Sequence, residues 1–119
     1  MGFLARWLNS EKLPELPEEA LIADHARAEV RTAAGYVIVV LATDAAPAVA
    51  RACRQRQPIQ LRGGDRHVTI TPVPRSRKVA LDPEHGWIIP ITDPICTALA
   101  AMTSTPHTFE FDGLAFVVE

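Results

Sequence analysis

The sequence predicts an α+β domain with a mostly antiparallel sheet, preceded by an N-terminal helical arm. Short apolar runs are separated by Gly, Pro and Asp, as expected for strands joined by tight turns. Two stretches with helical spacing each follow a Thr-Asp pair and carry a proline near their start. The chain has 119 residues, 48% hydrophobic and 22% charged, which fits one globular domain and excludes a disordered tail.

Residues 1–28 are predicted to form the arm and a first helix. A helix is expected over 17–28, because Pro17 suits a first helical turn and acidic residues follow it. In the arm, four apolar side chains share one helical face, and we expect this face to bind a partner. They are Phe3, Leu4, Trp7 and Leu8.

The remaining residues, 29–119, are predicted to form a single α+β domain. Its first half is expected to hold a hairpin over 30–42, a helix over 45–56 and a hairpin over 59–71. The pair Gly63-Gly64 leads from strand to strand, which favours a hairpin turn over a phosphate-binding loop.

The second half repeats this order. Short strands are expected at 79–81 and 87–91, a helix over 94–103, and a last hairpin over 108–118 around Asp112-Gly113. Pro90 favours an edge position for the strand over 87–91, because proline cannot donate to a neighbouring strand.

The turn residues of the two halves match. The matching positions are Gly35 and Gly86, Thr43-Asp44 and Thr92-Asp93, and Pro58 and Pro106. This correspondence predicts an internal duplication of a β-β-α-β-β unit, with repeats at 29–72 and 77–118. The apolar strand 114–118 is either central in the second repeat or an edge that pairs with another chain.

Charge is segregated along the chain. Residues 1–50 carry net charge −3 and residues 81–119 carry −6, whereas the segment between them carries +7, so that the total is −2. Eight basic side chains in this segment are candidates for binding nucleic acid or another anion, since arginine binds phosphate as a bidentate fork. They are Arg51, Arg54, Arg56, Arg62, Arg66, Arg75, Arg77 and Lys78.

An intramolecular role for this basic segment stays open, because the acidic segments could lie beside it. On the hairpin over 59–71, alternation places Ile59, Leu61, Val68 and Ile70 in the core. Polar residues are then expected to point outward. They are Gln60, Arg62, His67, Thr69 and Thr71.

Signals for catalysis or cofactor binding are weak, and we expect no catalytic residue, cofactor or metal. Asp82, Glu84 and His85 could share a metal, but a solvated loop is the better interpretation because their spacing matches no recurring metal motif. Cys53 and Cys96, 43 residues apart, are expected to be buried free thiols in a reducing compartment.

These observations favour a small non-enzymatic accessory or interaction protein that acts through protein–protein contacts, as a homodimer or with another protein. The alternative is a nucleic-acid-associated protein that uses 51–78. From Tyr36 onward the repeated order strand–helix–strand–strand–strand resembles one domain of a DNA sliding clamp. A small enzyme using Cys96 or the group around Asp82 comes third.

The start of the chain lacks a signal-peptide pattern, and no apolar run reaches membrane-spanning length, so we expect a cytoplasmic protein without membrane partners. Arginine outnumbers lysine ten to two, a bias typical of GC-rich bacterial genomes.

Overall fold

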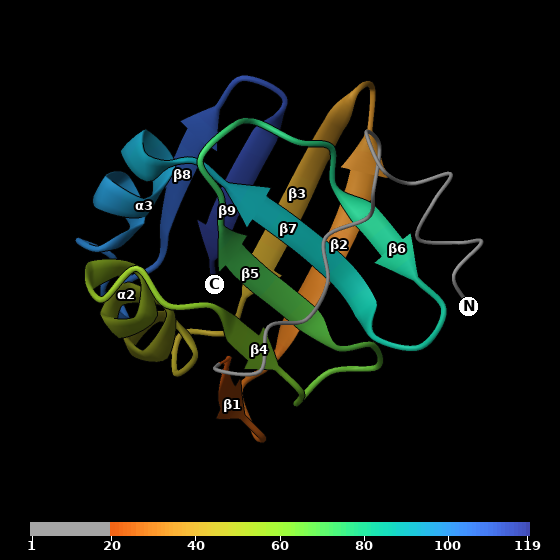
Figure 1. Cartoon of the computed structure of the whole chain (residues 1–119). Helices are drawn as coiled ribbons and strands as arrows, with labels where there is room; N and C mark the ends of the chain where they lie inside the picture. Colours follow the sequence, from red (N-terminus) through yellow and green to blue (C-terminus); the bar gives the residue numbers. More distant parts are fainter. Residues whose placement is uncertain (1–19) are drawn as a thin grey trace.

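The computed structural model describes residues 20–119, which form two packed β-sheets and two short helices (Figure 1). The strands of the two sheets cross one another, and both helices lie together at one side of the sandwich. The elements are β1 (Leu21–Ala23), β2 (Ala28–Ala33), β3 (Tyr36–Leu41), α2 (Ala46–Arg54), β4 (Ile59–Leu61), β5 (Val68–Pro72), β6 (Ala80–Asp82), β7 (Gly86–Ile91), α3 (Asp93–Leu99), β8 (His107–Phe111) and β9 (Leu114–Val118).

The sheets are mixed, not mostly antiparallel as the sequence predicted. One sheet has the strand order β1-β4-β5-β7-β6 and the other has the order β2-β3-β9-β8. The three predicted hairpins are antiparallel, as expected, and so is the β6–β7 pair. Parallel pairs join these units, β3 with β9 and β5 with β7, and a third parallel pair adds β1 to β4. These parallel pairs connect strands that no short turn links, so no turn motif in the sequence predicts them.

The predicted order of elements is observed twice, as β2-β3-α2-β4-β5 and β6-β7-α3-β8-β9. Each sheet takes the first hairpin of one unit and the second hairpin of the other. The two parallel joins β3·β9 and β5·β7 therefore occupy equivalent places in the two sheets. Descent of the halves from one duplicated unit stays a prediction, which superposition of 29–72 on 77–118 tests.

The helix expected over 17–28 is wrong within the described residues. Leu21–Ala23 form β1, which pairs in parallel with β4, and residues 24 and 25 turn toward β2. The helical pattern was short, and pairing with the β4 backbone satisfies the polar groups of this segment instead. The predicted helical arm, with Phe3, Leu4, Trp7 and Leu8, lies outside the described residues.

The strand containing Pro90 is also placed differently, because β7 lies between β5 and β6 and is not an edge strand. The N–H of Trp87 donates to the His67 carbonyl on β5's side, so alternation points the nitrogen of Pro90 toward β6. Pairing with β6 ends at Ile88, opposite Ala80. Proline therefore removes a donor at a position where no β6 residue is left to accept it, which explains why Pro90 is tolerated in an internal strand.

Close approach of two backbones explains the glycine pair in the β4–β5 loop. A Cβ added to Gly63 would lie 2.6 Å from the carbonyl oxygen of His25, and one on Gly64 would lie 2.7 Å from that of Ala28. The Gly63 N–H donates to the Ala26 carbonyl at 2.8 Å. These glycines therefore hold the β1–β2 connection against the sheet, and the expected hairpin turn has a packing role.

The core lies between the sheets and is closed by the helices. Leu41, Leu99 and Phe116 are fully buried there. The helix α2 contributes mainly small side chains, such as Ala50 and Cys53, which let it approach α3 closely. Within the described residues no helix has the length and apolar character needed to cross a membrane.

Candidate interaction surface

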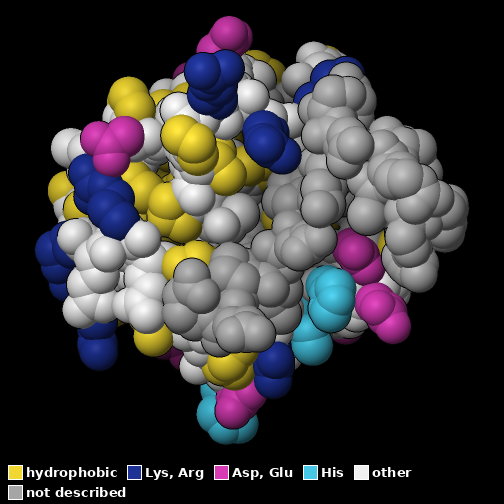
Figure 2. Space-filling model, in the orientation of Figure 1, with side chains coloured by type: hydrophobic (Ala, Val, Ile, Leu, Met, Phe, Trp, Pro, Cys, Tyr) yellow, Lys and Arg dark blue, Asp and Glu magenta, His cyan; other side chains and the backbone are white. Residues whose placement is uncertain are grey.

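The eight basic residues of 51–78 are all exposed, but they do not form one patch. Arg51, Arg54 and Arg56 lie on or just after α2, whereas Arg66 and Arg75 lie beyond opposite ends of β5. A five-residue strand is about 16 Å long, so β5 alone separates those two side chains widely. Figure 2 shows Lys and Arg as separate groups on the face in view, interrupted by hydrophobic and acidic side chains.

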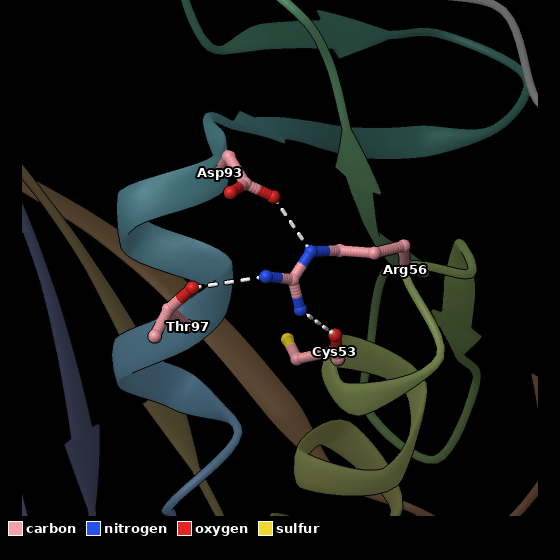
Figure 3. A network of polar contacts seen from close by, with 4 residues as sticks. All are labelled: Cys53, Arg56, Asp93 and Thr97. Atoms are coloured by element: carbon pink, nitrogen blue, oxygen red, sulfur yellow. Dashed lines mark hydrogen bonds and ion pairs between the residues drawn. The ribbon is translucent and has the colours of Figure 1, made fainter.

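Two of these arginines bind α3. The guanidinium of Arg54 donates to the carbonyl oxygen of Ala100, just after the end of α3, at 3.0 Å. That of Arg56 donates to the Asp93 carboxylate at 2.6 Å and to the Thr97 hydroxyl at 2.9 Å, both on α3 (Figure 3). We call Arg54 and Arg56 the arginine clamp, because together they hold both ends of α3.

The same guanidinium also secures its own helix. Arg56 donates to the carbonyl oxygen of Cys53 at 2.7 Å and has a positive φ of 53°, the left-handed conformation that often follows a helix. The hydrogen bond to Asp93 raises the pKa of the Arg56 guanidinium above its ordinary value. This cation therefore stays charged and is used within the fold, as the intramolecular alternative proposed.

The other basic side chains meet varied surroundings. Arg62 donates to the Gln60 side-chain oxygen at 2.6 Å and lies 3.9 Å from an Asp24 carboxylate oxygen. Arg77 and Lys78 line a pocket of about 620 Å³ whose walls include Ile95, Phe111 and other apolar residues. The basic side chains of this segment therefore lie in three separate regions: at the contact of α2 with α3, beside Gln60 and Asp24, and at the pocket lined by Arg77 and Lys78.

The polar residues expected on the outside of the β4–β5 hairpin are in part buried. Gln60 and Thr69 are each 1% exposed, and Thr71 is 5% exposed. Their polar groups are paired: the Gln60 amide donates to the Thr69 hydroxyl at 3.2 Å and its oxygen accepts from Arg62. The expectation failed because β4 and β5 are buried on both faces, where polar groups are tolerated only when hydrogen-bonded.

An apolar stripe lies on the outer side of the four-stranded sheet. Ile38 and Val40 of β3 pair in register with Ala115 and Val117 of β9. They alternate with core residues such as Phe116, so they point away from the core. We call these four residues the β3–β9 face; Ile38, Val40 and Val117 are half-buried, and Ala115 is 6% exposed.

The strand edges beside this face carry opposite charges. Arg31 on β2 pairs in register with Ile38, and Glu110 on β8 pairs with Ala115, so both charges lie in one row across the sheet. Glu29, one row away on β2, forms an ion pair with Arg31 at 3.2 Å. A stripe of apolar side chains with polar edges is the usual anatomy of a protein–protein contact.

The β3–β9 face was missed in the sequence, although both strands were recognised. The runs 36–42 and 114–118 are apolar on both faces, a pattern typical of central strands, and for 114–118 an edge position was the alternative. Both strands are central in the sheet, so the edge alternative for 114–118 is wrong. Because β9 is internal, it can contact a partner through its outward side chains but not through its backbone.

The loop between β6 and β7 brings Asp82, Glu84 and His85 together, with potential ligand atoms within 4.8 Å of one another. An oxygen of Asp82 already accepts the backbone N–H groups of Glu84 and His85, at 2.7 Å and 3.1 Å. This is a turn-stabilising use of aspartate, as expected for a solvated loop.

The fold defines the chain as a two-sheet α+β domain, and the comparisons with known proteins support that class. No family model and no curated protein matches the sequence. Among solved structures, the chain is similar to Drosophila Suppressor of Fused, with a TM-score of 0.52 and 13% sequence identity. The match covers 98% of this chain but only 34% of that protein, so the likeness concerns the fold of about a third of it.

Proposed function

We propose that the chain is a non-catalytic protein-interaction domain that forms a homodimer through the β3–β9 face. The observation that carries this proposal is the apolar stripe of Ile38, Val40, Ala115 and Val117, edged by charges of opposite sign. The distant likeness in fold to Suppressor of Fused supports an interaction domain.

A second copy fits this face because its charges are self-complementary. In a face-to-face dimer with its two-fold axis parallel to β3, the β2 edge of one copy lies over the β8 edge of the other. Since Arg31 and Glu110 share one row, Arg31 of each copy then meets Glu110 of the other. The apolar stripe has only four residues, so we expect association at micromolar concentrations.

Sedimentation velocity over a concentration series tests the proposal. We expect Val40→Lys, which places a charge in the stripe, to give a monomer. Arg31→Glu and Glu110→Arg should each weaken the dimer about tenfold by opposing like charges, and the double variant should restore it. Arg51→Glu on α2 is the matched control and should leave the dimer intact.

Each unfavourable outcome contradicts a different part of the homodimer proposal. A wild-type protein that stays monomeric at several hundred micromolar refutes the homodimer. A dimer that survives Val40→Lys places the interface elsewhere. Loss of association in both charge variants without recovery in the double variant refutes only the orientation of the two-fold axis.

Nucleic-acid binding remains the second candidate, favoured by the exposure of the eight basic residues. Arg51, Arg75 and Lys78 are its best remaining contacts, since the arginine clamp is used within the fold. Fluorescence anisotropy with labelled duplex DNA at low salt tests it, with affinity expected to fall steeply as salt rises. Absence of binding, or binding unchanged by Arg51→Glu with Arg75→Glu, excludes this role. The sliding-clamp likeness concerns element order alone and adds no support to this candidate.

A further inference from the structure

Two cysteines from different halves of the chain meet where α2 packs on α3. Cys53 of α2 is 2% exposed and Cys96 of α3 is fully buried, and the two thiols lie close enough for each to affect the pKa of the other. The helices are in direct contact, and Figure 3 shows Cys53 at the end of α2 beside α3. Both cysteines are buried and free, as predicted, but their spacing of 43 residues does not predict that they meet.

We propose that Cys53 and Cys96 are a redox-active dithiol, which a peroxide oxidises to an intramolecular disulfide that ties α2 to α3. The disulfide requires the two sulfur atoms to approach to about 2 Å, and the packing of α2 on α3 already brings both side chains to one helix–helix contact. The bridge would link residues 43 apart in sequence, and so the two predicted repeats. The proposal is independent of the β3–β9 face.

The oxidation balances with hydrogen peroxide as the oxidant. The sulfur of Cys96 attacks one peroxide oxygen, the O–O bond breaks, and the departing hydroxide takes the thiol proton to form water. Cys53 then attacks the resulting sulfenic acid, the S–O bond breaks, and the hydroxyl leaves with the Cys53 proton as a second water. Two thiols lose two electrons in total, and the peroxide is reduced to two waters.

Electrostatics favours Cys96 as the attacking group. Burial, together with the neighbouring thiol, raises the pKa of Cys53 to about 12. Burial also raises the pKa of Cys96, but there the Arg56 guanidinium and the hydrogen bond with Cys53 both lower it. The pKa of both thiols is thus raised, and the Arg56 guanidinium makes Cys96 the one that more readily forms the nucleophilic thiolate.

Access to the pair depends on the arginine clamp. Both thiols are buried, so a large oxidant cannot reach them without separation of the helices, and we expect slow oxidation by a small one. Arg56 joins α2 to α3 through the Cys53 carbonyl, Asp93 and Thr97. Its loss weakens this connection but also removes the charge that favours the Cys96 thiolate. Arg56→Gln has both effects, whereas Arg56→Lys retains a charge without the forked geometry. Comparing the two variants therefore distinguishes loss of the connection from loss of the charge.

Intact-mass spectrometry and thermal unfolding of the whole chain test the proposal. After treatment with hydrogen peroxide, we expect the mass to fall by about 2 Da as two hydrogens are lost, with recovery after reduction. The oxidised protein should unfold at least about 5 °C higher, because the bridge restricts the unfolded chain. Cys53→Ala and Cys96→Ala should each abolish the 2 Da loss, and Arg51→Glu should leave it unchanged.

Three results would overturn the inference. They are unchanged thiols after prolonged exposure, oxygen addition of about 16 to 48 Da without a bridge, and a disulfide that joins two molecules. If the alanine variants fail to fold, differential alkylation of the oxidised wild-type protein followed by peptide mapping locates the bridge directly. A map without a Cys53–Cys96 crosslink then counts against the proposal.

Discussion

Ala34 occupies a turn position that costs conformational energy. In the β2–β3 hairpin, Ala34 has a φ of 51° and Gly35 has a φ of 84°, so both turn residues are in the left-handed region. Two-residue hairpins with this geometry match the twist of the strands, but they favour Asn-Gly or Gly-Gly over Ala-Gly. The turn therefore stores backbone strain at an exposed alanine.

Replacing this alanine should stabilise the protein. We expect Ala34→Asn to raise the free energy of unfolding by about 0.5–1 kcal/mol, since asparagine tolerates the left-handed conformation better than alanine. Urea unfolding measures the change. Ala33→Asn, one residue earlier at the end of β2, is the control and should bring no gain. Equal stability of Ala34→Asn and wild type would show that this turn is not strained.

The buried thiol of Cys53 links stability to pH. Its pKa is raised to about 12 in the folded protein, mainly by burial, so the folded state keeps a proton that the unfolded state releases near pH 9. The stabilisation of the folded protein by this protonated thiol is complete below pH 9. It declines as pH rises toward 12, and the free energy of unfolding then falls by at most about 1.4 kcal/mol per pH unit. Urea unfolding between pH 8 and 10.5 should show a smaller decline for Cys53→Ala than for wild type. Parallel declines in the two proteins would contradict this linkage.

At the scale of elements, the two short helices depend on each other. The helix α3 has only seven residues, and a helix this short is unstable alone. Packing against α2 and the hydrogen bonds of the arginine clamp therefore stabilise α3. The clamp also explains why part of the basic segment lies beside acidic and carbonyl oxygens of the second half.

Reversing the charge of Arg54 tests the clamp. Its guanidinium donates to the carbonyl of Ala100, where a cation favours the negative end of the helix dipole. We expect Arg54→Glu to lower the free energy of unfolding by about 1 kcal/mol. Arg51→Glu, on the same helix and equally exposed, should change it by less than about 0.5 kcal/mol. Chemical denaturation of both variants gives the comparison, and equal effects would dismiss the clamp.

For the whole molecule, the exchange of hairpins between sheets makes the halves interdependent. The first half contributes β2 and β3 to one sheet and β4 and β5 to the other, and the second half completes both. A half alone would expose the paired edges of β3 and β5 together with one side of the core. Neither half has the features of an independent folding unit.

Fragments test this interdependence. We expect peptides 1–74 and 75–119 to lack cooperative thermal unfolding when measured separately by circular dichroism. Mixing them at equal concentration should restore part of the native spectrum, because each supplies the strands that the other lacks. Cooperative unfolding of either fragment by itself would show that one half folds alone, which would contradict the proposed sharing of a core.

The sequence by itself determined the local elements from 29 onward. The three predicted hairpins, the two short strands before α3 and the two helices lie close to their predicted positions, because turns, helix starts and alternating apolar residues are encoded within a few neighbouring residues. The burial of both cysteines also followed from composition and residue type. For the segment 20–28 the local pattern was misleading, since pairing with β4 decides its conformation.

Only the tertiary structure decided how these elements meet. The parallel joins, the internal position of β7 and the burial of Gln60 all depend on strands that are distant in the chain. The β3–β9 face, the arginine clamp and the thiol pair depend on the same long-range packing. Local sequence cannot specify such contacts, because each requires two surfaces whose separation is set by every element between them.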